Sequence, residues 1–135
     1  MSLSDWAELK VLEHIVGKTS WTMPTTYLAL CLAAPGEANS GDAISEVADQ
    51  YDYARVATSG DWNSASAGQI DNANLISFAE ANGGSWGLIT HWALMTSPVH
   101  GEGYMITWGT LTTPKQIDDA DTARFAVGDI VITAD

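Results

Sequence analysis

The chain has few cations, a single cysteine and no long apolar run, and each scarcity excludes a class of protein. Five Lys and Arg residues stand against seventeen Asp and Glu residues, which gives a formal net charge of −12. Nucleic acids and anionic lipid surfaces require positive partners, so we expect neither to bind. No apolar stretch approaches the roughly 18 residues that a transmembrane helix requires. Solubility explains the acidity most simply, and a calcium site or a surface for a basic partner is the sharper alternative.

The only cysteine, Cys31, excludes an internal disulfide. It lies in the apolar run 26–32, so we predict a buried and unreactive thiol. Residues 1–5 contain neither a basic nor an apolar segment, and we therefore expect no cleaved signal peptide. Synthesis in the cytoplasm of the producing cell is consistent with the sparing use of cysteine.

The length of 135 residues predicts a single domain that covers the whole chain, 1–135. It opens with the one clear helical pattern, over about residues 4–16. Ser4 or Asp5 can cap this helix, Glu8 stands at capping-box spacing, and Gly17 suits its end. Because the helix is short and amphipathic, a sheet or a partner must cover its apolar stripe. The stripe consists of Leu9, Leu12, Ile15 and Val16.

The remaining sequence, from about residue 25 to 135, has the pattern of short strands. Turn signals recur about every ten residues, which predicts a mainly β fold, an antiparallel β-sandwich of about seven strands. Thr113-Pro114-Lys115 is expected to end the strand that begins at residue 104. Residues 36–52 form a long loop, of the kind that carries function or contacts to neighbours. The expected strands are 27–32, 53–57, 75–78, 86–96, 104–111, 122–126 and 129–133.

The segment 83–95 follows a double-glycine turn and alternates two sets of apolar side chains. This period of two predicts a central strand, covered on both faces and paired with 104–111 as a hairpin. The segment holds no nucleophile or acid, which favours a structural or binding protein over an enzyme. The predicted faces are Leu88, Thr90, Trp92 and Leu94 on one side, and Ile89, His91, Ala93 and Met95 on the other.

The histidines and Ser85 do not match the patterns of a zinc site or of a serine hydrolase. His14, His91 and His100 share no metal-ligand spacing, so we expect no zinc site. His14 is expected at the solvent-facing side or edge of the helix, and His91 in a structural role. Ser85 lies in Gly-Gly-Ser-Trp-Gly, which is explained by a turn and does not match a nucleophile elbow.

Two groups of aspartates are candidates for catalytic pairs or for metal ligands. Asp49 and Asp52 form one group, and Asp118, Asp119 and Asp121 form another. Both lie in polar loop sequence that would not raise a carboxyl pKa, so we do not expect a glycosidase-type pair. Calcium would suit the second group better, although its spacing is not that of an EF-hand and a solvated turn is simpler. We therefore predict no enzyme, and no catalytic, cofactor-binding or metal-binding residues.

Three isolated side chains remain as candidates for contacts. Trp62, in a loop, either makes a surface contact or pins the loop to the core, and we hold both interpretations open. Arg55 and Arg124 are scarce cations inside strand-like segments. We expect each to pair with a carboxylate, as a buried or interfacial arginine must.

Several landmarks follow one another along the chain. They are a short Leu-rich N-terminal helix ending in Gly17, the segment 24–30, Pro35-Gly36-Glu37-Ala38, Tyr53-Ala54-Arg55, Trp62, Phe78, Trp86-Gly87, Thr90-His91-Trp92-Ala93, the segment 109–115, Phe125 and Gly128-Asp129. Their order resembles a family of small tailed-bacteriophage proteins known as tail fibre or tail-associated virion proteins. This sequence departs from the family pattern twice. Tyr51 and Asp52 precede Tyr53-Ala54-Arg55 where a glycine pair is usual, and Asp119-Ala120-Asp121 stands where glycine-aspartate is usual.

The resemblance implies a non-enzymatic virion structural protein, associated with the tail or its fibres and made in the cytoplasm of the bacterial host. Its expected partners are other virion proteins and further copies of itself. A capsid decoration (cement) protein is the alternative of the same origin. An alternative of another class is a module that binds host glycans through Trp62 or neighbouring aromatic residues.

Overall fold

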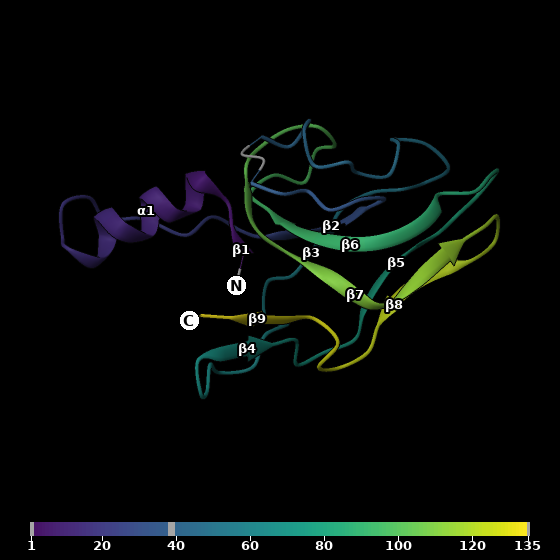
Figure 1. Cartoon of the computed structure of the whole chain (residues 1–135). Helices are drawn as coiled ribbons and strands as arrows, with labels where there is room; N and C mark the ends of the chain where they lie inside the picture. The colour runs from purple at the N-terminus through teal and green to yellow at the C-terminus, as the bar shows by residue number, and fades with distance from the viewer. Residues whose placement is uncertain (1, 38–39, 135) are drawn as a thin grey trace.

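The computed structural model describes residues 2–37 and 40–134. The fold is mainly β, with antiparallel sheets and a helix near the N-terminus, as the sequence predicts (Figure 1). No helix among the described residues is long and apolar enough to cross a membrane. The elements are β1 (Ser2–Leu3), α1 (Asp5–Ile15), β2 (Tyr27–Cys31), β3 (Val56–Ala57), β4 (Gln69–Asp71), β5 (Ile76–Glu80), β6 (Gly87–Met95), β7 (Met105–Ile117), β8 (Thr122–Phe125) and β9 (Val131–Thr133).

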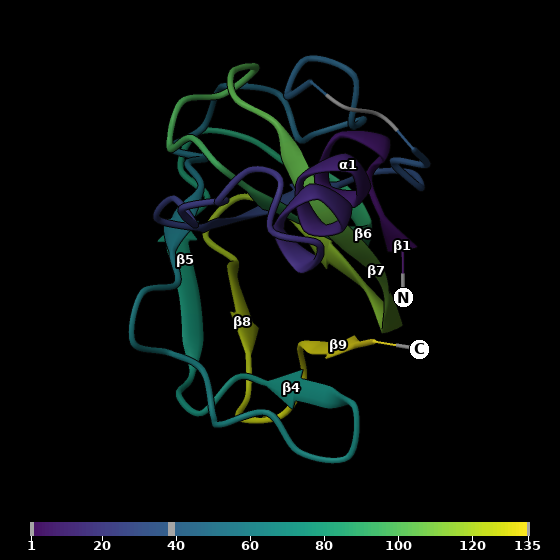
Figure 2. The same ribbon diagram turned by 90° about the vertical axis from the view of Figure 1, so that its left-hand side faces the viewer.

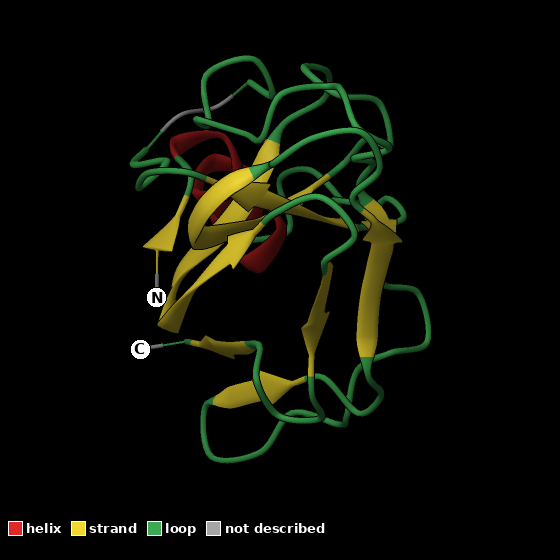
Figure 3. Ribbon diagram, turned by 90° about the vertical axis from the view of Figure 1, so that its right-hand side faces the viewer, coloured by secondary structure: helices red, strands yellow, loops and turns green. Residues whose placement is uncertain are grey.

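A five-stranded sheet forms one layer of the sandwich, in the order β1-β7-β6-β2-β3. The second layer consists of two antiparallel ribbons, β5–β8 and β4–β9, which lie across the core from the sheet (Figures 2 and 3). The main core fills the space between the layers. Its largest members are the aromatic residues Tyr53, Phe78, Trp86, Trp92 and Phe125.

The strand β6 is central, as predicted, and pairs with β7 as a hairpin and with β2 on its other edge. A second, smaller core covers the opposite face of the sheet. Its buried members come from β2, β6 and β7, except Ile44, which lies in the long loop; Trp108 of β7 packs against this core and is partly buried. The sheet is therefore covered on both faces, which explains why β6 is apolar on both.

The strict alternation predicted along β6 is wrong at its middle. Ile89 and Trp92 belong to the same core although they are three positions apart, a spacing that strict alternation would place on opposite faces. The register with β7 jumps at this point, because the partner of Ile89 is Lys115 and the partner of His91 is Thr110. The extra residues on β7 form an irregular bulge, which shifts the phase of the side chains.

The same bulge corrects the predicted end of β7. The strand does not stop at Thr113 but continues to Ile117. Pro114 falls within the bulge, where its missing N–H removes no ladder hydrogen bond. The strands β1 and β4 were not predicted, because two and three residues are too few to show a period.

We predict that Trp92→Ala lowers the free energy of unfolding by about 3–5 kcal/mol, the cost of truncating a large core aromatic. Trp92 is buried, and its indole lies against the backbone of Gly109. Urea denaturation of the two proteins measures the difference. Leu88→Ala on the same strand is the control and should change stability by only about 0.5 kcal/mol, because Leu88 is exposed. Equal, small effects of the two substitutions would contradict the central role of β6.

Candidate functional site

A buried ion pair fixes the long loop between β2 and β3. The Arg55 guanidinium donates to both carboxylate oxygens of Glu46, from Nε at 2.9 Å and from one terminal nitrogen at 2.8 Å. The two side chains are 0% and 3% exposed. Bidentate pairing of this kind is the geometry in which a buried arginine is best satisfied. The prediction that Arg55 pairs with a carboxylate is confirmed.

The same pair connects three separate segments. The second terminal nitrogen of Arg55 donates to the backbone carbonyls of Ser97 and Glu102, both at 2.9 Å, in the turn between β6 and β7. The Tyr53 hydroxyl donates to Glu46 at 2.6 Å and accepts the N–H of Leu30, in β2, at 3.0 Å. The loop, the turn and the sheet are thus held together by one polar cluster.

Glu46 was missed by the sequence reasoning. It lies in a loop rich in acidic and small residues, where nothing local separates it from its neighbours. The available signal was the apolar pair that brackets it, Ile44 and Val47, both of which are buried. Arg124, in contrast, is exposed on β8 and forms no ion pair with any described carboxylate, so the prediction for it is wrong.

Burial sets the protonation of the groups beside this pair. Burial, reinforced by the negative charge of Glu46, raises the pKa of the Cys31 thiol from 9.0 to about 12. Burial and Glu46 likewise raise the pKa of the Tyr53 hydroxyl. Cys31 is buried and stays protonated, as predicted, so it is neither a nucleophile nor a ligand near neutral pH.

The helix α1 has its apolar stripe on the outside. Leu9, Leu12, Ile15 and Val16 are 61–76% exposed. The only helix residue that is fully buried is Ala7. At 100° per residue, Leu9 and Val16 lie roughly opposite Ala7 around the helix axis. A surface helix normally turns its apolar stripe toward the core, so the outward orientation of this stripe is unusual for a small domain.

The helix is nevertheless firmly attached to the sheet at its first turn. Ser4 caps it, accepting the N–H of Ala7 at 3.2 Å and donating from its hydroxyl to the carbonyl of Met105. The Trp6 ring stacks on Tyr104, with centroids 4.7 Å apart. From this anchor the helix projects away from the sheet (Figure 1). The apolar stripe is therefore displayed on a fixed support.

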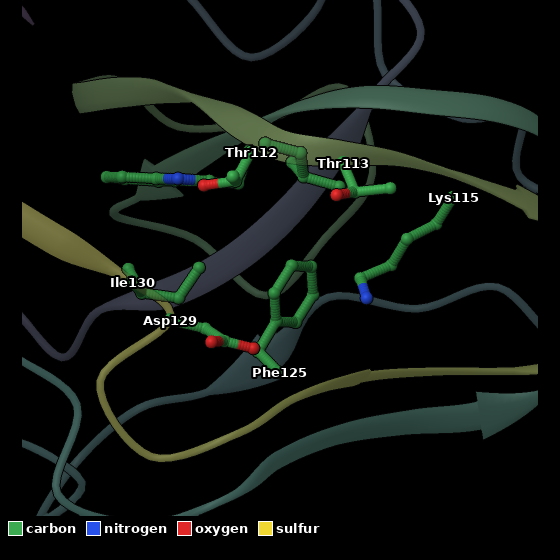
Figure 4. A pocket seen from close by; sticks show the side chains of 8 residues that line it. Thr112, Thr113, Lys115, Phe125, Asp129 and Ile130 are labelled. Atoms are coloured by element: carbon green, nitrogen blue, oxygen red, sulfur yellow. The ribbon is translucent and has the colours of Figure 1, made fainter.

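A groove of about 330 Å³ opens on the other side of the molecule, between β7 and the segment that joins β8 to β9 (Figure 4). Its charged groups already have structural contacts. Lys115 Nζ lies 5.4 Å from the centre of the Phe125 ring, and Asp129 accepts the N–H of Ala126 at 2.8 Å. These residues do not form a nucleophile–base or acid–base pair. The lining consists of Trp92, Leu111, Thr112, Thr113, Lys115, Phe125, Asp129 and Ile130.

Comparison with known families identifies the relationship. A sequence model of the family described as podophage GP4 fiber I protein gp80 matches residues 2–133. The chain belongs to this family. No curated protein matches the chain. The resemblance to phage tail fibre proteins is thereby confirmed, and membership in the fiber family implies a place in the virion, contacts with other virion proteins and a non-enzymatic role.

The histidines of this fiber family member lie apart from one another. His14 is exposed, as expected, and accepts the N–H of Trp21 at 3.1 Å. His91 is half-buried and shares a hydrogen bond of 2.7 Å with Thr90, and burial lowers its pKa. His100 bonds to the carbonyl of Val47 at 2.8 Å, so it also helps to hold the long loop.

The aspartates after β7 stabilise turns. Asp119 accepts the N–H of Gly83 at 2.8 Å, and Asp121 accepts the N–H of Asp118 at 2.9 Å. Ser85 donates to the carbonyl of Ile117 at 3.0 Å, as a turn residue does. Asp49 and Asp52 are both exposed, in the loop before Tyr53. These hydrogen bonds place Ser85, Asp119 and Asp121 in turn-stabilising positions.

Trp62 is half-buried and packs against the main core. It also forms an isolated bridge with Asn72 through the backbone. Of the two interpretations that the sequence left open, the side chain that pins its loop fits this position.

The two departures from the family pattern fall at unusual backbone angles. Tyr51, Asp52 and Ala120 have φ of 55°, 63° and 71°, in the left-handed region that glycine favours. The Tyr51 ring packs so closely over Gly84 that a Cβ there would lie 2.5 Å from its Cζ. The backbone bend at residues 51 and 52 therefore forms without the usual glycines. The absence of a side chain at Gly84 leaves the space that the Tyr51 ring occupies.

We predict that Glu46→Gln or Arg55→Met lowers the free energy of unfolding by about 3–5 kcal/mol, because each leaves its partner buried and incompletely paired. Chemical denaturation monitored by tryptophan fluorescence measures the loss. Glu13→Gln removes the exposed contact to Lys18, 3.9 Å long, and is the control, with an expected loss below about 1 kcal/mol. Losses as small as that of the control would show that the buried pair is not needed for folding.

We predict that the free energy of unfolding falls as the pH rises from about 9 to about 12. The folded protein keeps the protons of Cys31 and Tyr53, whose pKa values are raised, while the unfolded chain releases them. Stability falls with pH wherever the unfolded state binds fewer protons. Urea titrations over this range measure the slope, and Cys31→Ala should make it shallower. An unchanged slope in that variant would contradict the assignment.

Proposed function

We propose that this protein is a structural component of a podophage fibre, which acts through contacts with further copies of itself and with other virion proteins. Membership in the fiber family supports the fibre, and the outward apolar stripe of α1 supports the contacts. The stripe is the observation that carries the proposal, because a protein that works alone gains nothing from exposing four large apolar side chains on one helix.

The long loop between β2 and β3 supports the same role. Its described residues, 32–37 and 40–55, belong to no helix or named strand, yet the Glu46–Arg55 pair, Tyr53 and His100 hold the loop against the sheet. A loop that is fixed in this way presents a defined surface, and it loses little conformational entropy when a neighbour docks on it. The acidic surface keeps the protein soluble before assembly.

Two other functions compete with this proposal. A capsid decoration protein would use the same kind of surface on a different part of the particle. A glycan-binding module would need an exposed aromatic platform, and the half-buried position of Trp62 against the core makes it a poor one. Neither alternative has an observation that favours it over the fibre.

The test is electron microscopy of particles produced with and without the gene for this protein. We expect particles without it to keep an intact, fully decorated head and to lack a tail-associated fibre density. Normal fibres together with a bare capsid surface would support the decoration protein instead. A glycan array with binding that Trp62→Ala abolishes would support the glycan module.

A further inference from the structure

We infer that the free edge of β7, over residues 109–113, binds an additional strand from another virion protein, an extended segment that carries at least one lysine or arginine. The inference rests on the proposed function, because the partner is expected in the same particle. Three observations on the described residues support this occupant: two unpaired strand edges that line one hollow, the placement of the chain's own strands, and the charge beside the hollow.

The first unpaired edge is the outer edge of β7. Among the described residues, β1 pairs with this edge at Thr107 and Trp108, and Ser4 donates its N–H to the carbonyl of Ile106 at 2.9 Å. Because the peptide groups of alternate residues in an antiparallel strand point to the same side, those of Thr110 also point away from β6. Thr110 is exposed, and no described strand pairs with the outer edge beyond Trp108.

The second unpaired edge belongs to β9. Ala134, which follows this strand, donates its N–H to the carbonyl of Gly68 at 2.7 Å, toward β4. By the same alternation, the peptide groups of Val131 and Thr133 point away from β4. Both residues are exposed, and β4 is the only strand in the described part of the chain that pairs with β9.

The two edges line one hollow of about 270 Å³, where β9 lies beside β7 (Figures 2 and 3). Thr110 belongs to its lining on one side, and Val131 and Thr133 on the other. The hollow continues into the groove of about 330 Å³ shown in Figure 4, because Trp92 lines both. An extended polypeptide satisfies unpaired peptide groups of this kind better than a helix or a saccharide does, because its own N–H and C=O groups alternate in direction.

The far end of the free edge is closed to pairing. Pro114 has no N–H to donate, and Lys115 turns its amine toward the Phe125 ring, with Nζ 5.4 Å from the ring centre. Proline and lysine on a free edge reduce non-specific strand pairing. The segment that docks is therefore short, and it lies along residues 109–113, between β1 and Pro114.

The placement of the strands and the charge identify the kind of partner. The strands that the structure describes are all paired within the chain's own sheets, so a folded second copy has none of them to offer. Asp129 lines the groove and accepts the N–H of Ala126, and it forms no ion pair with any described cation. This carboxylate and the net charge of −12 attract a segment that carries a lysine or an arginine.

The first experiment identifies the partner by photo-cross-linking in purified particles. A benzophenone amino acid replaces Thr110 in one preparation, and Leu75, which is 55% exposed beside β5, in the control. We expect irradiation to join the Thr110 position to a basic segment of another virion protein, and the Leu75 position not to reach that segment. A cross-link only to a second copy of this chain, or no cross-link at all, would overturn the inference.

The second experiment measures how the cross-linked segment, made as a synthetic peptide, binds to the full chain. Thr110→Pro removes the outward N–H and should weaken binding by more than about tenfold. Amide hydrogen exchange in the wild type gives an independent readout, because the peptide should slow the exchange of the Thr110 N–H. Full binding to folded Thr110→Pro, or an unchanged exchange rate at Thr110, would show that the segment does not add as a strand.

The same peptide tests the charge. Asp129→Asn keeps an oxygen for the N–H of Ala126 and removes only the charge, so binding should weaken about two- to fivefold. Asp119→Asn is the matched control, because Asp119 also accepts one backbone N–H at 2.8 Å, from Gly83, and does not line the groove. Equal binding by the two variants would contradict the basic segment. Failure of the proposed function is recognised differently, by the absence of the wild-type protein from fibres.

Discussion

The buried pair of Glu46 and Arg55 is the constraint on which the rest of the structure depends. It brings together the long loop, the β6–β7 turn and, through Tyr53, the strand β2. The guanidinium and the carboxylate form hydrogen bonds with each other, and the guanidinium also with two backbone carbonyls. The free energy of removing both charges from water largely offsets these contacts, so the net stabilisation is small. The pair acts mainly on specificity: it allows one arrangement of the loop, because any other arrangement leaves a charge buried without a partner.

The sequence predicted the parts of this fold that have a period. The helix, the central strand β6 and its hairpin with β7 are long enough for their apolar spacing to identify them. The bulge opposite Ile89 could not be predicted, because it depends on how β7 packs and not on any local residue preference. Pro114 correctly indicated an irregularity in the strand. The predicted strand end was wrong, because a proline can also be accommodated in a bulge.

The candidate site was predicted unevenly for the same physical reason. The need of Arg55 for a partner followed from its setting among apolar residues, but the partner is nine residues away across a loop, and only tertiary contacts select Glu46. The apolar stripe of α1 was visible in the sequence, yet its direction was not. Which side of a helix faces the sheet is decided by the anchoring of Ser4 and Trp6, and the stripe alone would favour the opposite choice.

The reversed orientation of α1 has a consequence for how such a protein can change over generations. Because Ala7 is the only residue of α1 that is fully buried, substitutions on the outer stripe leave the core unaffected. In the proposed role of the stripe, recognition and folding are therefore under separate selection, and the contact specificity can change without a loss of stability. In most small domains the apolar side of a helix serves the fold first, and this freedom does not exist.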